Sequence, residues 1–221
     1  MKKIFHLLVL FLIVWTAACS SIHIDENDPA SLYKEAQGDI ESDHYQIAID
    51  KLRAIKNKFP YSSYASECQL RIADVYYMQD LFAEAAVNYQ IFKDLHPKHP
   101  KVPYAMFRVA KSYYKDAPTL IDRDLTPLKK SQDAYNEFIA RFPSAPEAIE
   151  ARKDIAEIKS KLAAKELLIG EFYIRRNLFE SAKPRLEKVA ANFPDTEEAK
   201  LALKKLDYVN QRLTTKQGNS K

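Results

Sequence analysis

Residues 64–97, YASECQLRIADVYYMQDLFAEAAVNYQIFKDLHP, have the pattern of two helices joined by a short turn. Apolar and small residues recur three and four positions apart on both sides of the turn, as they do along one face of an α-helix. Ala73 and Ala85 lie twelve residues apart, the separation that brings small side chains together where two antiparallel helices cross most closely. Pro97 follows Ala85 by another twelve residues, where it ends the second helix. This stretch therefore predicts a helix hairpin.

The spacing is that of the tetratricopeptide repeat, W-x2-L-G-x2-Y followed by A-x3-F and P. All slots but the first are filled, by Ile72, Ala73, Tyr76, Ala85, Tyr89 and Pro97. An earlier copy places Ala36, Ala48 and Pro60 at the same two intervals of twelve residues. The chain has 221 residues with only three glycines, which also favours helices. We therefore predict an all-α fold, a right-handed tetratricopeptide-repeat superhelix of about five helix hairpins, the last one partial.

Two later copies are longer than the regular ones. In the third, the closing Pro143 comes 33 residues after the first small residue, Ala110, where the regular copies have an interval of 24. The extra nine residues are expected in a loop within residues 115–127. The fourth has Gly170 in the small position, and one long helix over residues 145–169 is predicted to hold its insertion. Pro184 falls inside the second helix of this copy, which is expected to begin late or to kink. A last amphipathic helix is predicted over residues 196–213.

The N-terminus has the order of an export signal. Two lysines precede an apolar run that is too short to span a bilayer, and Cys19 follows small residues. This order is typical of a bacterial lipoprotein whose lipid is attached to Cys19, and an ordinary secretory signal with an incidental cysteine is the alternative. The predicted parts are a lipoprotein signal peptide at residues 1–18, a lipidated N-terminus and tether at 19–28, the repeat domain at 29–213 and a disordered tail at 214–221.

Composition and motifs favour neither an enzyme nor a nucleic-acid-binding protein. The 34 basic and 30 acidic residues nearly balance, so no electrostatic footprint for nucleic acid is expected. No Gly-rich phosphate loop, H-E-x-x-H, C-x-x-C or G-x-S-x-G motif occurs. His96 and His99 come nearest to a metal site, but a Pro-rich turn explains them. We expect no catalytic residue, no metal and no cofactor apart from the covalent lipid on Cys19.

The first helices of such hairpins line the concave side of the array, which makes them the candidate binding surface. Their outward residues lie three before, one after and four after the small residue. In the first three copies this rule gives Tyr33, Gln37, Ile40, Leu70, Asp74, Tyr77, Phe107, Lys111 and Tyr114. These nine residues are called the groove set. Their aromatic character suits an extended peptide with alternating aromatic side chains. The alternative is that individual rings pack between neighbouring repeats.

Several longer segments resemble one family of proteins. They are KFPYSSYASECQLRIADVYY (58–77), HPKHPKVPYAMFRVA (96–110), DRD (122–124) and NFPDT (192–196). With the lipoprotein signal and the repeats, they resemble the BamD family of outer-membrane protein assembly factors over nearly the whole mature chain. The resemblance implies a lipoprotein on the periplasmic face of the outer membrane. Its implied partners are the BamA-type barrel protein, other lipoproteins of the BAM complex and unfolded outer-membrane proteins.

The resemblance also implies roles for particular residues. Carried over by position, Tyr33, Tyr77, Phe107 and Tyr114 become candidates for contact with substrate. Arg185 resembles the family arginine in the BamA-contacting region, and a surface ion-pair residue is the alternative. The predicted function is a non-catalytic scaffold that docks BamA and engages unfolded outer-membrane proteins. A periplasmic tetratricopeptide adaptor for cell-wall enzymes would share the repeats and the export signal.

Overall fold

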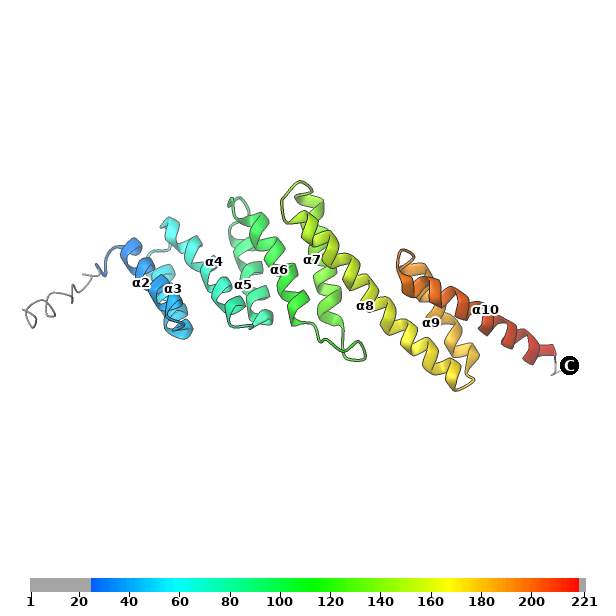
Figure 1. Cartoon of the computed structure of the whole chain (residues 1–221). Helices are drawn as coiled ribbons and strands as arrows, with labels where there is room; N and C mark the ends of the chain where they lie inside the picture. Colours follow the sequence, from blue (N-terminus) through cyan, green and yellow to red (C-terminus); the bar gives the residue numbers. More distant parts are fainter. Residues whose placement is uncertain (1–24, 219–221) are drawn as a thin grey trace, which may run out of the picture. The chain divides into compact units, whose positions relative to one another are not determined.

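The computed structural model describes residues 25–218, and within them every regular element is an α-helix (Figure 1). The helices are α2 (Pro29–Glu41), α3 (Tyr45–Lys58), α4 (Ser63–Met78), α5 (Phe82–Leu95), α6 (Val102–Asp116), α7 (Thr126–Arg141), α8 (Ala148–Arg175), α9 (Phe179–Asn192) and α10 (Glu197–Gly218). They form four consecutive hairpins followed by α10, so the all-α prediction and the predicted number of hairpins are confirmed. The predicted signal peptide, Cys19 and the tether as far as residue 24 lie outside the described residues.

The chain divides between Ala65 and Ser66 into two compact units. In the first unit, α2 begins where the sequence predicts. The carboxylate of Asp28 accepts hydrogen bonds from the backbone N–H groups of Ala30 and Ser31, and Pro29 occupies the first turn. The α2–α3 hairpin buries the apolar side chains Ala36, Ile40, Ala48, Ile49, Leu52 and Ile55.

Small residues occupy the predicted crossing positions of all four hairpins. They are all buried, as the pairs Ala36 and Ala48, Ala73 and Ala85, Ala110 and Ser131, and Gly170 and Ala182. In the third pair, the Ser131 hydroxyl donates to the carbonyl of Ala110 at 2.8 Å. In the fourth, a Cβ atom on Gly170 would lie 2.9 Å from Cδ2 of Leu186, so the glycine allows α8 and α9 to approach this closely.

Three of the hairpins share one turn structure. Asp43, Asp80 and Asn177 have φ values of 59°, 58° and 56°, in the left-handed region that Asp and Asn tolerate better than most residues. Each lies seven residues after the first small residue of its hairpin. The residue that follows each donates its backbone N–H to the carbonyl five positions earlier, as in the bond from Leu81 to Tyr76 at 3.0 Å. The first, second and fourth hairpins therefore close by the same local geometry.

The two insertions take the forms that the sequence predicts, and they meet. Residues 117–125 form the loop between α6 and α7, where the Asp124 carboxylate accepts from the backbone N–H and the hydroxyl of Thr126. Helix α8 runs for 28 residues without interruption and holds the second insertion. Lys165 on α8 donates from Nζ to the carbonyl of Arg123 in the loop. The loop and the extended part of α8 are therefore in direct contact.

The predicted end of α10 is wrong, and so is one of the two alternatives predicted for α9. Helix α9 begins at Phe179 and contains Pro184 as its sixth residue, so it does not begin late, while a kink stays a prediction. Phe179 is buried, and its packing stabilises the first turn although Pro184 cannot donate a backbone hydrogen bond. Helix α10 was expected to end at residue 213 but continues to Gly218. The hydroxyls of Thr214 and Thr215 donate to carbonyls of the preceding turn, so these polar side chains are satisfied within the helix. Residues 219–221 lie outside the described part.

Candidate binding surface

The members of the groove set differ in exposure. Ile40, Leu70 and Phe107 are buried, with 5%, 3% and 6% of their surface exposed. The other six are partly exposed: Tyr33, Gln37, Asp74, Tyr77, Lys111 and Tyr114. Tyr33 and Gln37 belong to the first unit, where the ring of Tyr33 packs against that of Tyr64 at 5.4 Å between centroids. The remaining partly exposed members lie in the second unit, Asp74 and Tyr77 on α4 and Lys111 and Tyr114 on α6.

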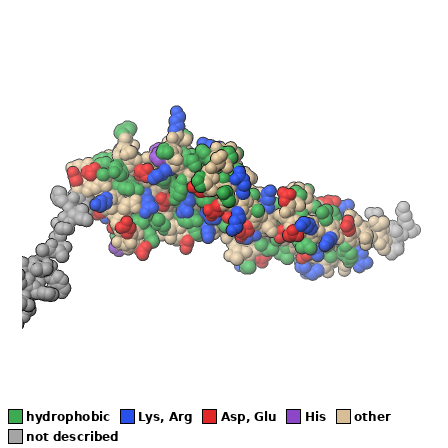
Figure 2. Space-filling view, turned by 45° about the horizontal axis from the view of Figure 1, so that its top comes forward, with side chains coloured by type: hydrophobic (Ala, Val, Ile, Leu, Met, Phe, Trp, Pro, Cys, Tyr) green, Lys and Arg blue, Asp and Glu red, His purple; other side chains and the backbone are tan. Residues whose placement is uncertain are grey.

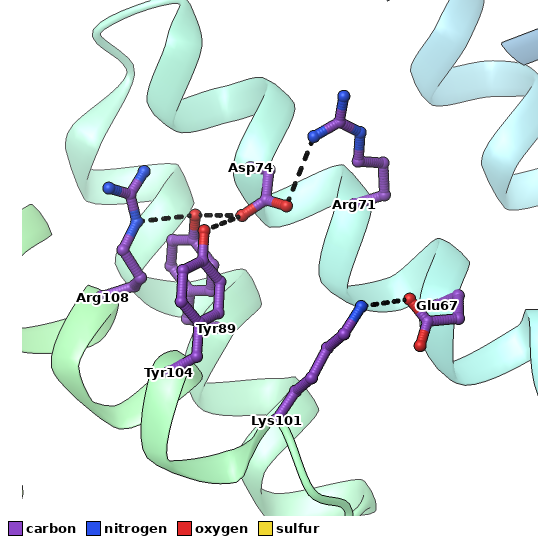
Figure 3. Close-up of polar contacts among 7 residues, drawn as sticks. All are labelled: Glu67, Arg71, Asp74, Tyr89, Lys101, Tyr104 and Arg108. Atoms are coloured by element: carbon purple, nitrogen blue, oxygen red, sulfur yellow. Dashed lines mark hydrogen bonds and ion pairs between the residues drawn. The ribbon is translucent and has the colours of Figure 1, made fainter. Parts of the chain in front are cut away.

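Asp74 on α4 is the centre of a polar cluster (Figure 3). Its carboxylate accepts hydrogen bonds from the hydroxyls of Tyr89 on α5, at 2.6 Å, and Tyr104 on α6, at 2.8 Å. Arg71, one turn earlier on α4, lies 3.6 Å from the second carboxylate oxygen. Burial and the nearby carboxylate raise the pKa of Tyr104 to about 12, and the same two causes raise the pKa of the buried Tyr89. Asp74 therefore links three helices, and both of its carboxylate oxygens already have partners within the chain.

Arg108 on α6 adds a cation to this cluster. Its Nε donates to the Tyr89 hydroxyl at 3.2 Å, and its guanidinium carbon lies 3.5 Å from the centroid of the Tyr77 ring. The Tyr77 ring also meets Phe82 edge-on at 5.1 Å. Figure 3 shows the two terminal nitrogens of Arg108 directed away from the Tyr89 and Tyr104 hydroxyls. The ring contact and the hydrogen bond to Tyr89 together restrict the orientation of the guanidinium.

A second cluster forms around Asp154 on α8, which is 5% exposed. Its Oδ2 accepts from the Tyr135 hydroxyl of α7 at 2.6 Å and from Lys111 Nζ of α6 at 2.7 Å. Lys111 also pairs with Glu150 at 2.7 Å. Burial alone would lower the pKa of Lys111, but its hydrogen bonds to Asp154 and Glu150 outweigh burial and raise that pKa. Lys111 thus serves as a link between α6 and α8 and is not an open anchor.

Tyr114 on α6 lies beside this second cluster. The ammonium groups of Lys111 and Lys161 lie 5.1 and 5.3 Å from its ring centroid. Burial and a hydrogen bond to the Glu157 carboxylate raise the pKa of Tyr114. The ring remains partly exposed, so Tyr114 and Tyr77 are the aromatic members of the second unit that can still offer a face to a ligand.

Arg185 on α9 is held by a carboxylate that sequence reasoning did not name. Its Nη1 lies 3.1 Å from Glu166 on α8, and Lys188 contacts the other oxygen of Glu166 at 2.5 Å. Burial would raise the pKa of Glu166, but hydrogen bonds from Lys188 and Arg185 outweigh burial and lower it. The Arg185 side chain is still 40% exposed. It therefore has an intramolecular partner and an accessible face.

A cleft of about 500 Å³ opens next to this ion pair, where the insertion loop meets α7, α8 and α9. Its apolar side chains are Leu125, Leu162 and Phe193. Its charged side chains are Asp124, Lys129, Asp133, Lys165, Glu166 and Lys188. Both insertions predicted from the sequence therefore contribute to the lining of one cleft. The repeat spacing in the sequence did not predict this cleft.

Sequence reasoning missed Tyr104, Arg108, Asp154 and Glu166. Tyr104 and Arg108 are four residues apart on α6, and Arg108 directly follows Phe107 of the groove set, so a wider strip of the same helix would have included both. Asp154 and Glu166 sit on the extended α8, to which the repeat spacing assigns no role. The face of the molecule in Figure 2 shows basic and acidic side chains interspersed.

Two further features of residues 25–218 concern metals and membranes. No three His, Cys, Asp or Glu side chains among them are placed to hold a metal ion, and His96 and His99 instead pack against the Phe92 ring, at 5.3 and 5.1 Å. None of the described helices combines the length and the apolar character that crossing a bilayer requires.

Comparison with known proteins assigns the chain to a family. The model of the outer membrane lipoprotein family YfiO matches residues 25–221. The chain belongs to this family. A Vibrio cholerae relative named outer membrane protein assembly factor BamD is 28% identical over 184 residues, which cover 79% of this chain and 76% of the relative. A Neisseria gonorrhoeae protein of the same name is 27% identical over 227 residues, covering 94% of this chain and 84% of the relative.

The relatives confirm the resemblance to BamD that the sequence segments indicated. Among solved structures, a tetratricopeptide repeat protein from Parabacteroides merdae aligns with 83% of this chain and 74% of its own, with a TM-score of 0.44 and 13% identity.

Proposed function

We propose that this chain is a non-catalytic scaffold of the machinery that assembles β-barrel proteins in the outer membrane. The observation that carries the proposal is the match of the outer membrane lipoprotein family to residues 25–221. The relatives named outer membrane protein assembly factor BamD support it. In this proposal a lipid on Cys19 anchors the chain at the periplasmic face of the membrane.

The proposed partner is a BamA-type barrel protein, docked at the C-terminal hairpins, together with other lipoproteins of the same complex. Arg185 is the proposed contact. Glu166 on α8 binds the guanidinium through one carboxylate oxygen and Lys188 through the other, and 40% of the Arg185 side chain remains exposed. A carboxylate on the partner would find the remaining guanidinium donors already oriented. The cleft beside Glu166 adds a hollow into which a projecting side chain of the partner could fit.

The proposed substrates are unfolded outer-membrane proteins, which offer extended segments with alternating aromatic side chains. Tyr77 and Tyr114 are the proposed contacts in the second unit, since both rings are partly exposed. Tyr33 and Gln37 are the corresponding candidates in the first unit. Leu70 and Phe107 are almost completely buried, so their proposed role is to pack beneath the exposed side chains and not to contact substrate. Asp74 and Lys111 fix the helices through their internal hydrogen bonds.

Peptide binding tests this proposal. Replacing both Tyr77 and Tyr114 by alanine is expected to weaken binding of the C-terminal strand peptide of an outer-membrane barrel protein about tenfold, because two ring faces are lost. Fluorescence anisotropy of a labelled peptide measures the dissociation constant, and circular dichroism verifies that the variant is folded. Tyr208→Ala, which removes a ring 42% exposed on α10, is the matched control and should leave affinity unchanged. An affinity of the double variant equal to wild type contradicts the proposal.

A further inference from the structure

Arg108 differs from the other cations around the Asp74 cluster. Arg71 pairs with Asp74, Lys101 pairs with Glu67 at 2.7 Å, and both are drawn in Figure 3. Lys111, one turn further along α6, has two carboxylate partners. Arg108 forms no ion pair within the described part of the chain, and its polar contact there is the hydrogen bond from Nε to the Tyr89 hydroxyl. The Tyr89 hydroxyl in turn donates to Asp74, so that carboxylate reaches the partly buried Arg108 only through the hydroxyl.

The geometry of Arg108 leaves its binding edge open. A guanidinium carries five N–H donors in a planar fork. Arg108 uses Nε towards Tyr89, and its terminal nitrogens point away from that contact (Figure 3). The Tyr77 ring supports one face of the guanidinium at 3.5 Å. Two parallel N–H groups held in a fixed plane match the two oxygens of a carboxylate.

The neighbouring side chains indicate which kind of ligand would carry such a carboxylate. Tyr77 is partly exposed and is itself a proposed substrate contact, so a group bound to Arg108 would lie next to the proposed peptide surface. Asp74 is the nearest carboxylate of the cluster, and the two tyrosine hydroxyls and Arg71 already occupy it. An incoming carboxylate would therefore meet the guanidinium without displacing an internal ion pair.

We propose that Arg108, in contact with the Tyr77 ring, binds a carboxylate of the extended peptide that this chain engages. The proposal rests on the proposed substrate engagement and specifies its chemistry. The carboxylate is either the free C-terminus of the peptide or an Asp or Glu side chain within it. Because the fork is oriented before binding, little conformational entropy is lost when the two hydrogen bonds form.

Three forms of one peptide with alternating aromatic residues test the proposal, each carrying an uncharged dye. The first has a free C-terminal carboxylate and no acidic side chain, the second is its C-terminal amide, and the third is that amide with one internal Glu. Wild-type full-length chain is expected to bind at least one carboxylate form about tenfold more tightly than the plain amide. The form that gains affinity identifies the source of the carboxylate.

Variants of the chain then test whether Arg108 causes the preference for the carboxylate form of the peptide. Arg108→Gln should remove it, and Arg108→Lys, which keeps the charge but not the planar fork, should retain only part of it. Arg175→Gln removes an exposed arginine from α8 and should retain the preference in full. Equal binding of all three peptides by wild type, or a preference that persists in Arg108→Gln, overturns the inference and leaves substrate engagement intact. Absence of binding by any peptide overturns the proposed engagement and the inference with it.

Discussion

Replacing Asp154 by alanine is expected to lower the free energy of unfolding by about 3 kcal/mol. Asp154 is almost fully buried, and it accepts hydrogen bonds from Tyr135 and Lys111. Without it, the hydroxyl of a completely buried tyrosine has lost its acceptor, and Lys111 retains only the more exposed Glu150. A buried polar group without a partner costs its full desolvation free energy.

Urea denaturation followed by circular dichroism measures this change. Asp207→Ala, which removes an exposed carboxylate from α10, is the matched control and should stay within about 0.5 kcal/mol of wild type. Tyr135→Phe in the Asp154→Ala background removes the unsatisfied hydroxyl and is expected to cost much less than Tyr135→Phe alone. Wild-type stability in Asp154→Ala, or additive costs in the double variant, would show that the cluster does not hold α7 and α8 together.

Phe107→Ala is expected to destabilise the chain by about 3 to 4 kcal/mol. The Phe107 ring is 6% exposed and lies 5.8 Å from the centroids of both Tyr135 and Phe138, which are themselves completely buried. Truncation would leave a cavity in the buried cluster that contains Phe107, Tyr135 and Phe138, and these two rings cannot fill it without leaving their own positions. Although Phe107 belongs to the groove set, the Phe107→Ala substitution is therefore expected to lower stability and not peptide affinity.

The same denaturation experiment tests the prediction for Phe107. Phe172→Ala removes a ring 45% exposed on α8 and should cost less than about 1 kcal/mol. Peptide affinity of Phe107→Ala, measured where the variant is folded, is expected to match wild type. A stable Phe107→Ala protein with weakened peptide binding would instead place Phe107 among the substrate contacts.

The repeat spacing in the sequence predicted most of the fold correctly, because it records a steric requirement. Only a small residue fits where two helices cross closely, and the pairs from Ala36 to Gly170 satisfy this in all four hairpins. Departures from the spacing located the loop and the long helix. The ends of α9 and α10 were harder to predict, because tertiary packing of Phe179 offset the effect of Pro184 and the terminal threonines bonded within the helix.

The candidate site was predictable only in part. The rule for outward positions found the right helices, but it cannot tell an exposed ring from one that a neighbouring repeat covers, as the contrast between Tyr77 and Phe107 shows. Exposure depends on the helix that packs next, which is far away in the sequence. Asp74 and Lys111 likewise looked like open anchors because their partners, Tyr104 and Asp154, come from later repeats.

Affinity purification of the tagged full-length chain from membranes solubilised in mild detergent tests the proposed scaffold function most directly. Mass spectrometry identifies the proteins that accompany wild type and Arg185→Glu. The proposal predicts that a BamA-type barrel protein co-purifies with wild type and is strongly reduced with Arg185→Glu, whose reversed charge would repel both Glu166 and a carboxylate on the partner. Recovery of a peptidoglycan synthase in the absence of any barrel assembly protein would contradict it and support the adaptor alternative.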